Sequence, residues 1–304
     1  MKVIVVSDLE WLHKPTAIAL GNFDGVHRGH QRVITSVLHR EGLISTVVTF
    51  NPHPRDFFSG RMSSFLTPLA EKMALLQAMG VEQLVVLPFT RELASLRAEN
   101  FVAEILQQGL DAQLVSVGCD FRFGWQRQGD VQLLRSFFGD RVLVVAEQRL
   151  EGASSIRISS SAIKTALGEG NVALANDLLG RRYSITGHVV TGQQLGRELG
   201  FPTANLQVDP QKYLPRDGVY AVLWRGQPGV MNIGVRPTVA GERKRTVEVH
   251  LLNWEGNLYG QEMTVELLRF IREEKKFASL AELQNQIQRD CEVALGCSEL
   301  AQNC

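Results

Sequence analysis

The stretch Ala17-Ile18-Ala19-Leu20-Gly21-Asn22-Phe23-Asp24-Gly25-Val26-His27-Arg28-Gly29-His30 decides the fold of the first half of the chain. It begins as an apolar run, breaks at a glycine, and crosses a turn that holds three glycines and two histidines. After the turn, apolar residues recur at helical spacing at Val33, Ile34, Val37 and Leu38, which predicts one apolar helix face. A strand, a glycine-rich turn and a helix in this order are typical of α/β proteins that present backbone N–H groups to a phosphate.

The turn contains the residue types that a phosphate site needs. Its three glycines remove Cβ atoms where a ligand must come close. His27 and His30 lie three residues apart, which places them on one side of the first helical turn. Two imidazoles there can hydrogen-bond phosphate oxygens and stabilise the negative charge that grows during phosphoryl or nucleotidyl transfer. The alternative is a pair of solvated loop histidines, which surface loops often carry.

The block from Gly21 to His30 resembles the HxGH nucleotidyltransferase superfamily. The surrounding sequence resembles one branch of it, the adenylyltransferase module of bacterial bifunctional riboflavin kinase/FAD synthetases. This resemblance implies that His27 and His30 are catalytic and that the turn binds ATP. The ATP-binding residues that it implies here are Gly21, Asn22, Phe23, Asp24, Gly25 and Gly29.

Length and composition limit the class of protein. A chain of 304 residues favours two domains, each with its own core. The formal net charge is +0, so no overall field attracts nucleic acid or a membrane. No apolar segment reaches the roughly 18 residues that span a bilayer, and the four cysteines show no metal-ligand spacing. We therefore expect a cytoplasmic protein that binds small molecules, neither nucleic acid nor membrane, as a monomer or weak homo-oligomer.

Apolar, β-branched runs alternate with helical patterns over residues 1–182. This alternation predicts a parallel, doubly wound sheet. After the first strand, we expect strands over residues 43–50, 84–89, 114–117 and 141–145, and helices over 69–79, 101–108 and 172–179. A dinucleotide dehydrogenase or a P-loop NTPase is disfavoured, since neither G-x-G-x-x-G at the first helix nor G-x-x-x-x-G-K-[ST] occurs. The resemblance implies a Rossmann-like nucleotidyltransferase domain.

Two loops at strand ends extend the resemblance. Asn51-Pro52-His53-Pro54 follows a strand, and its prolines favour an extended loop; it resembles the family's element for flavin phosphate binding. Gly118-Cys119-Asp120-Phe121-Arg122-Phe123-Gly124 resembles a second family segment. The resemblance places Asp120 near the adenine and ribose of ATP, and Arg122 and Phe123 with the flavin. From its residue type alone, a structural role of Asp120 as a turn-former or helix cap is as much expected as a binding role.

A serine-rich segment, Arg157-Ile158-Ser159-Ser160-Ser161-Ala162-Ile163-Lys164, is expected at the start of a helix. Hydroxyl groups there can cap the helix or bind phosphate. The segment resembles the family signature I-S-S-T-x-[IV]-R, which assigns Arg157, Ser159, Ser160, Ser161 and Lys164 to ATP. It departs from the family at Ser161, where the family has threonine, at Ala162, where many members carry arginine, and at Lys164, which replaces an arginine. Lysine keeps the charge but loses the bidentate fork.

The pattern changes type after Gly180-Arg181-Arg182. Short β runs over residues 185–190, 204–208, 218–224, 230–233, 246–252 and 263–268 predict a small antiparallel barrel. A closing amphipathic helix is expected over about 279–295. We therefore predict an adenylyltransferase domain over 1–182 and a second domain over 183–304, which the resemblance makes an all-β, six-stranded riboflavin kinase barrel.

The segment from Thr191 to Asn205 is a weak phosphate-loop signal on its own, because glycine-rich hairpins are common. It resembles the flavokinase signature G-x-x-x-G-R-x-L-G-F-P-T-A-N almost residue for residue. The kinase ATP site implied by this match comprises Gly192, Gly196, Arg197, Gly200, Phe201 and Pro202. Thr203 and Asn205 share one face of an extended segment, and oxygen ligands of this kind suit Mg²⁺, which the family places there.

Glu248 and His250 share one face of a predicted strand, opposite Val247, Val249 and Leu251. The pattern alone favours the solvated face of a barrel strand. The family resemblance instead makes Glu248 the general base that takes the proton of the ribityl hydroxyl.

The resemblance as a whole implies a bifunctional enzyme. The barrel would phosphorylate riboflavin with ATP to FMN, and the first domain would transfer AMP from a second ATP to FMN, giving FAD and pyrophosphate. Two alternatives stay open: a monofunctional adenylyltransferase with a decayed barrel, and a flavin-binding regulator without turnover.

Overall fold

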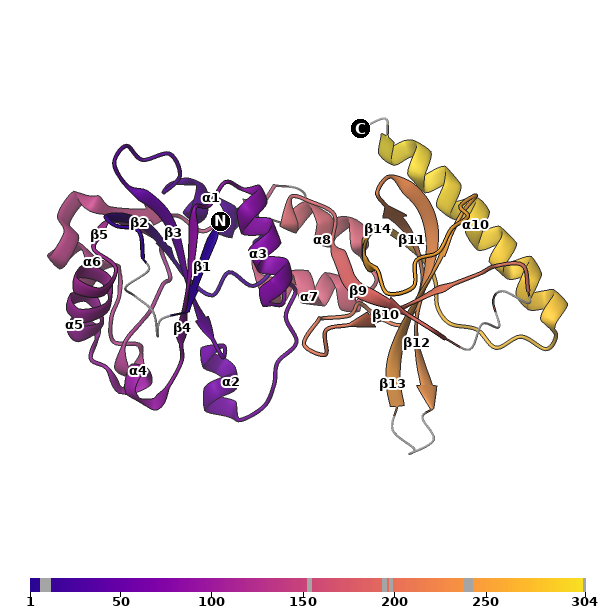
Figure 1. Ribbon diagram of the computed structural model, residues 1–304, viewed down its shortest axis with the longest axis horizontal. Helices are drawn as coiled ribbons and strands as arrows, with labels where there is room; N and C mark the ends of the chain where they lie inside the picture. The colour runs from indigo at the N-terminus through magenta and orange to yellow at the C-terminus, as the bar shows by residue number, and fades with distance from the viewer. Residues whose placement is uncertain (6–11, 152–154, 193–195, 197–198, 238–242, 303–304) are drawn as a thin grey trace. The chain divides into compact units, whose positions relative to one another are not determined.

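The computed structural model describes residues 1–304 apart from 6–11, 152–154, 193–195, 197–198, 238–242 and 303–304 (Figure 1). The chain divides into two compact units, Met1–Ser160 and Ser161–Cys304. Two helices before the predicted 182/183 boundary, α7 (Ser160–Gly168) and α8 (Val172–Leu179), thus group with the second unit. The reason is visible at Asn176, whose side chain donates to the carbonyl of Leu267 at 3.1 Å and accepts from the backbone N–H of Tyr183 at 2.7 Å.

The first unit is built on a parallel sheet with the strand order β1-β4-β3-β2-β5-β6, which confirms the predicted fold class. Its strands are β1 (Lys2–Val5), β2 (Thr16–Leu20), β3 (Ile44–Asn51), β4 (Gln83–Pro88), β5 (Ala112–Gly118) and β6 (Val142–Val145). The helical segments are α1 (Arg28–Thr35), α2 (Pro54–Ser59), α3 (Leu69–Ala78), α4 (Arg91–Ser95), α5 (Ala98–Asn100), η2 (Phe101–Gly109), η3 (Trp125–Arg127), α6 (Val131–Phe138) and η4 (Gly139–Arg141). A short antiparallel pair, β7 (Arg149–Leu150) and β8 (Ile156–Arg157), completes the unit.

Strand β2 is buried along its whole length and supplies side chains to both faces of the sheet. Ala17 and Ala19 pack in the core formed with α1 and α3, and Ile18 and Leu20 pack in the core formed with η2 and α6. Strand order reverses at β2, because β3 follows on one side and β5 on the other. In open α/β sheets, ligands bind at the carboxyl ends of strands at such a switch point. The glycine-rich turn is therefore located where a ligand site is expected.

One predicted helix differs in type. The helix expected over residues 101–108 is a π-helix, η2, and its last backbone bonds include that from Leu110 N to Ile105 O at 2.9 Å. Single π-helical segments inside α-helices are frequent near functional sites. Phe101, at the start of η2, also lines the cavity described below.

The second unit is a closed antiparallel barrel with the order β10-β13-β12-β11-β14-β9, covered by one long helix (Figure 1). The strands are β9 (Ser184–Val190), β10 (Ala204–Val208), β11 (Gly218–Trp224), β12 (Gln227–Pro237), β13 (Arg243–Leu251) and β14 (Glu262–Arg272). Helix α10 (Leu280–Gln302) packs on β11, β12 and β14, which is why β11 is buried on both faces. Within the described parts of the chain, no helix has the length and apolar character to cross a membrane.

Candidate active sites

The turn between β2 and α1 has an unusual backbone. Phe23, Gly25 and Val26 have φ values of 52°, 89° and 40°, and a bulky or β-branched residue at positive φ is strained. His27 caps α1, since its Nδ1 accepts from the backbone N–H of His30 at 3.2 Å. The two imidazoles stack with centroids 3.5 Å apart and planes at 17°. The predicted pair of histidines therefore lies together at the start of the helix.

Hydrogen bonds from neighbouring segments fix the conformation of this turn. The N–H of Gly25 donates to Thr67 Oγ1 at 2.8 Å, and the N–H of Thr67 donates to Asp24 Oδ1 at 3.2 Å. From the predicted serine-rich segment, Ser160 Oγ donates to the carbonyl of Asp24 at 2.8 Å. The structure thus joins two sequence motifs that lie 136 residues apart.

Two further predicted ATP residues meet as an ion pair. Arg157 donates to Asp120 Oδ2 at 2.5 Å through one terminal nitrogen and to Glu147 Oε2 at 3.0 Å through Nε. All three side chains are well exposed. An exposed pair of this kind stabilises a fold by no more than about 1 kcal/mol, so the guanidinium can exchange a carboxylate for a phosphate at little cost.

A cavity of about 810 Å³ in the same unit is lined mainly by aromatic rings. Of the predicted flavin residues, His53, Pro54, Arg122 and Phe123 line it, whereas the exposed Asn51 and Pro52 are not among its lining residues. The remaining aromatic and cationic lining residues are Phe50, Phe58, Phe89, Phe101, Phe121, Arg55 and Arg127. Such a cavity can stack a planar ring and pair an anionic group with arginine. Asn22 of the turn also lines it, which connects the cavity to the phosphate-binding element.

In the barrel unit, Glu248 occupies a regular strand. It lies on β13 in register with Asn205 on β10 and Asn232 on β12. Val247 and Val249 are 3% and 1% exposed, so the face that carries Glu248 is the opposite one, as predicted. Glu248 lines a cavity of about 390 Å³. Other residues of that cavity are Thr203, Asn232, Phe201, Phe277, Leu283 and Ile287.

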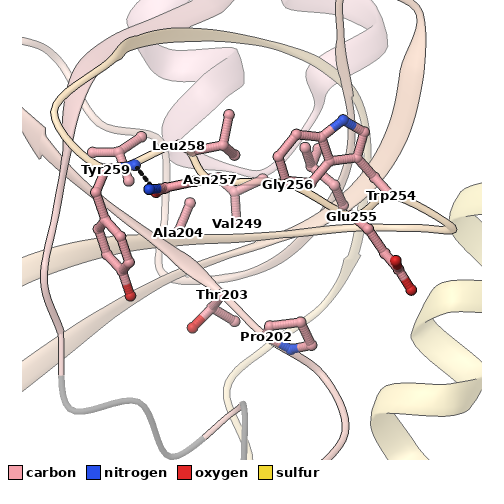
Figure 2. Close-up of a pocket in the computed structure, with 12 residues that line it drawn as sticks. Pro202, Thr203, Ala204, Val249, Trp254, Glu255, Gly256, Asn257, Leu258 and Tyr259 are labelled. Atoms are coloured by element: carbon pink, nitrogen blue, oxygen red, sulfur yellow. Dashed lines mark hydrogen bonds between the residues drawn. The ribbon is translucent and has the colours of Figure 1, made fainter.

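A second cavity of the barrel, of about 490 Å³, is lined mainly by apolar groups (Figure 2). Trp254 and Tyr259 lie at its two sides in Figure 2, and a segment around Asn257 lies between them, with the N–H of Tyr259 donating to Asn257 Oδ1 at 3.0 Å. Thr203 lines both this cavity and the one that contains Glu248. The two cavities therefore share a wall at a residue that the sequence predicts as a metal ligand.

Comparisons with known proteins find relatives of both parts of the chain. The model of the FAD synthetase family matches residues 9–162, and that of riboflavin kinase matches residues 179–297. A curated bifunctional riboflavin kinase/FMN adenylyltransferase from Pseudomonas fluorescens is 40% identical over 93% of each chain. The protein of the same name from Escherichia coli K12 is 43% identical over 90% of each chain. The chain belongs to the bifunctional riboflavin kinase/FMN adenylyltransferase family. A crystal structure from Streptococcus pneumoniae, titled as a macrolide-efflux protein, shares the fold with a TM-score of 0.81 and 30% identity, over 97% of this chain and 99% of that one.

The glycines of the flavokinase motif have a steric reason. A Cβ at Gly192 would overlap the side-chain amide of Asn205, and one at Gly196 would come within 2.5 Å of the carbonyl oxygen of Phe201. Gly200 has φ 85°, which favours glycine. Arg197 of this motif lies outside the described residues.

The last residues of the serine-rich segment belong to the second unit. The carbonyl of Lys164 accepts from the hydroxyl of Tyr213 at 2.8 Å, and its Nζ lies 5.8 Å from the centroid of that ring. Ser161 is exposed at the start of α7. Their assignment to ATP stays a prediction.

Sequence reasoning missed most of the aromatic lining and the residues of the apolar barrel cavity. A signal was available for Phe89, which directly follows β4 at the carboxyl edge of the sheet, where ligands bind. Lys275, which sequence reasoning did not assign to a site, lines the cavity of Glu248 while remaining exposed. Trp254 had no such signal, because it lies in a loop with no periodicity, whereas Tyr259 belongs to the segment Leu258-Tyr259-Gly260, which resembles the flavokinase family.

Proposed function

We propose that the barrel phosphorylates riboflavin with ATP and that the α/β unit transfers AMP from a second ATP to the FMN so formed, through the residues described above. The observation that carries this proposal is the placement of Glu248, whose cavity shares Thr203 with a neighbouring apolar cavity. The proposed base and the two cavities proposed for riboflavin and ATP are thus contiguous in one barrel.

In the kinase reaction, riboflavin would occupy the cavity of Glu248 and ATP the apolar cavity. The carboxylate of Glu248 takes the proton of the terminal ribityl hydroxyl while that oxygen attacks the γ-phosphorus, and the bond from the γ-phosphorus to the bridging oxygen breaks to release ADP. A positioned general base contributes about 10²- to 10⁴-fold to such a rate. His250 has a supporting role: its Nδ1 lies 2.8 Å from the carbonyl of Pro202, and because a carbonyl only accepts, Nδ1 carries the proton.

The donor set near the shared wall fits Mg²⁺. Thr203 and Asn205 offer a hydroxyl and an amide oxygen, which are hard ligands of the type that Mg²⁺ prefers. Asn205 is directly opposite Glu248 in the barrel register, and Thr203 borders the cavity assigned to ATP. These two residues would hold the ion, which neutralises the charge of nucleotide phosphates when bound.

In the second reaction, a phosphate oxygen of FMN attacks the α-phosphorus of ATP, and the bond to the pyrophosphate leaving group breaks. The nucleophile is already an anion, so the site needs no general base. It needs orientation and charge stabilisation, which supply most of the acceleration at phosphorus. The stacked His27 and His30, together with the helix start, would stabilise the charge. The aromatic cavity would hold the isoalloxazine ring, with its arginines near the phosphate.

One assay tests this proposal against the alternatives. The protein is incubated with riboflavin, ATP and Mg²⁺, and the flavin products are separated by chromatography over time. We expect FMN to appear first and FAD to follow. FAD from supplied FMN but none from riboflavin would indicate a monofunctional adenylyltransferase with a decayed barrel. Flavin binding without any product would indicate a regulator.

A further inference from the structure

A buried lysine lies behind the glycine-rich turn, and neither reaction above uses it. Lys72 is on α3 and is 9% exposed. Its Nζ donates to the backbone carbonyl of Asn22 at 2.7 Å and to Thr49 Oγ1 at 3.4 Å. The hydroxyl of Thr49 in turn donates to the same carbonyl of Asn22 at 3.1 Å. The carbonyl that opens the turn is therefore held from two elements, α3 and β3.

A buried lysine at this position lowers the stability of the folded protein. Lysine is almost never fully buried, because its charge loses hydration. Burial lowers the pKa of Lys72 to about 8, against an opposing effect of the nearby carboxylate of Asp24. An apolar side chain of similar length would fill the space without that penalty. Groups that cost stability in this way concentrate at functional sites.

The geometry shows what the lysine controls. A trans peptide unit is planar, so the N–H of Phe23 points opposite to the carbonyl of Asn22. Fixing that carbonyl on the side of Lys72 therefore fixes the direction of the Phe23 N–H on the other side. The peptide unit lies between Asn22, which lines the flavin cavity, and the strained Phe23, whose ring contacts that of His30 edge-on at 5.4 Å.

We propose that Lys72 is a positioning residue for adenylyl transfer: it fixes the carbonyl of Asn22 and thereby holds the turn and His30 in the geometry that the α-phosphate requires. The proposal rests on the adenylyltransferase activity proposed above. The short segment from Thr67 to Lys72 makes three hydrogen-bond contacts with the turn: Thr67 bonds to Gly25 and Asp24, and Lys72 adds the third. Loss of this tie should affect the transition state more than the binding of ATP.

The test compares Lys72→Met and Lys72→Arg with Lys212→Met as a matched control. Lys212 is also buried, at 4% exposed, but lies in the barrel unit over the ring of Tyr183. We expect Lys72→Met to lower kcat for FMN adenylylation about tenfold to a hundredfold, the size of a small misplacement of reacting groups, while KM for ATP changes less than kcat. Lys72→Arg should recover part of the loss. Riboflavin phosphorylation by the same samples should stay at the wild-type rate, and Lys212→Met should leave adenylylation unchanged.

The outcomes separate this inference from the proposed function. If the wild-type protein makes no FAD, the proposed function is wrong. If the wild type makes FAD and Lys72→Met makes it equally fast, only the positioning role is wrong. Should Lys72→Met not fold, Thr49→Val decides, because it removes the second bond to the Asn22 carbonyl in nearly the same volume. A lowered kcat with little change in KM would support the inference, and wild-type turnover would overturn it.

Discussion

The residues proposed to act at a phosphorus atom are held in different ways in the two units. In the α/β unit, the functional groups belong to a turn with strained backbone at Phe23 and Val26. In the barrel, Glu248 belongs to a regular strand and is fixed by its register with Asn205 and Asn232. The difference follows from the nucleophiles. A phosphate anion needs N–H groups and cations around it, which a turn presents well, whereas a neutral hydroxyl needs one base at one point, which a strand positions rigidly.

The two sites are also supported differently. The turn is supported by buried polar groups on α3 and β3, which include a lysine that burial destabilises. The strand site is supported by the hydrogen-bonded barrel itself and by the apolar residues on its opposite face. We therefore expect a single substitution to affect one activity and not the other, so that each activity is the internal control for the other.

The largest expected effect is that of Glu248→Gln on riboflavin phosphorylation. The substitution preserves the shape of the side chain and removes its proton affinity, so kcat for FMN formation should fall about a hundredfold or more. Conversion of supplied FMN to FAD should be unchanged. Glu262→Gln on β14 is the matched control, because it neutralises an exposed carboxylate of the same barrel. Near-normal FMN production by folded Glu248→Gln would leave the kinase without its base and direct attention to His250.

His30→Ala should have the reverse pattern. Removing a group that stabilises transition-state charge costs about 10²- to 10³-fold, so FAD should almost disappear from the products while FMN accumulates from riboflavin. His13→Ala, at an exposed histidine of the same unit, should leave both products unchanged. Undiminished FAD from His30→Ala would contradict the assignment of the turn as the adenylyl-transfer site.

The sequence predicted the elements that local patterns specify, and it missed side chains whose surroundings form only in the folded protein. Periodicity predicted the sheet, the barrel and the closing helix, because burial of alternating or helical faces is a local property of the chain. Resemblance to family motifs singled out Glu248 and the two histidines as candidate catalytic residues. Lys72 and most of the phenylalanine lining were missed, because a lysine within a helix carries no local sign of burial, and Phe89 and Phe101 meet only after the sheet has formed.

The burial of Lys72 also predicts a pH dependence of stability. Its pKa is about 8 in the folded protein and 10.5 as the ordinary value. Between these values the unfolded chain binds more protons, so the free energy of unfolding rises with pH over this window. At 1.36 kcal/mol per pKa unit the full effect is roughly 3 kcal/mol, present as a penalty below pH 8 and absent above 10.5. Lys72→Met has no titratable group at this position and lacks this pH dependence. We therefore compare the free energy of unfolding of the wild type with that of Lys72→Met. The difference, wild type minus variant, should rise from pH 7 to pH 10. It is measured from the urea dependence of hydrogen exchange in β2 and β3. A difference that is flat with pH would show that the lysine is not desolvated.

The smallest expected effect concerns where the kinase domain begins. The packing of the folded chain divides it after residue 160, whereas the change in sequence pattern places the boundary at 182. We propose that both boundaries are meaningful: residues 183–304 hold the whole kinase site, and α7 and α8 only stabilise it.

A fragment of residues 183–304 should then make FMN at a rate close to that of a fragment of residues 161–304. It should be less stable by at least about 2 kcal/mol. It loses the two hydrogen bonds of Asn176 to Leu267 and Tyr183, each of which contributes about 1 kcal/mol, together with the bond from Tyr213 to Lys164 and the buried apolar side chains of α7 and α8. Urea unfolding and chromatography of the flavins measure the two quantities on the same samples. Asn176→Ala in the longer fragment should reproduce part of the stability difference, that of the two Asn176 hydrogen bonds, while leaving turnover intact. If residues 183–304 are instead unfolded by circular dichroism while 161–304 is folded and active, the barrel depends on these helices to fold, and the kinase domain begins at α7.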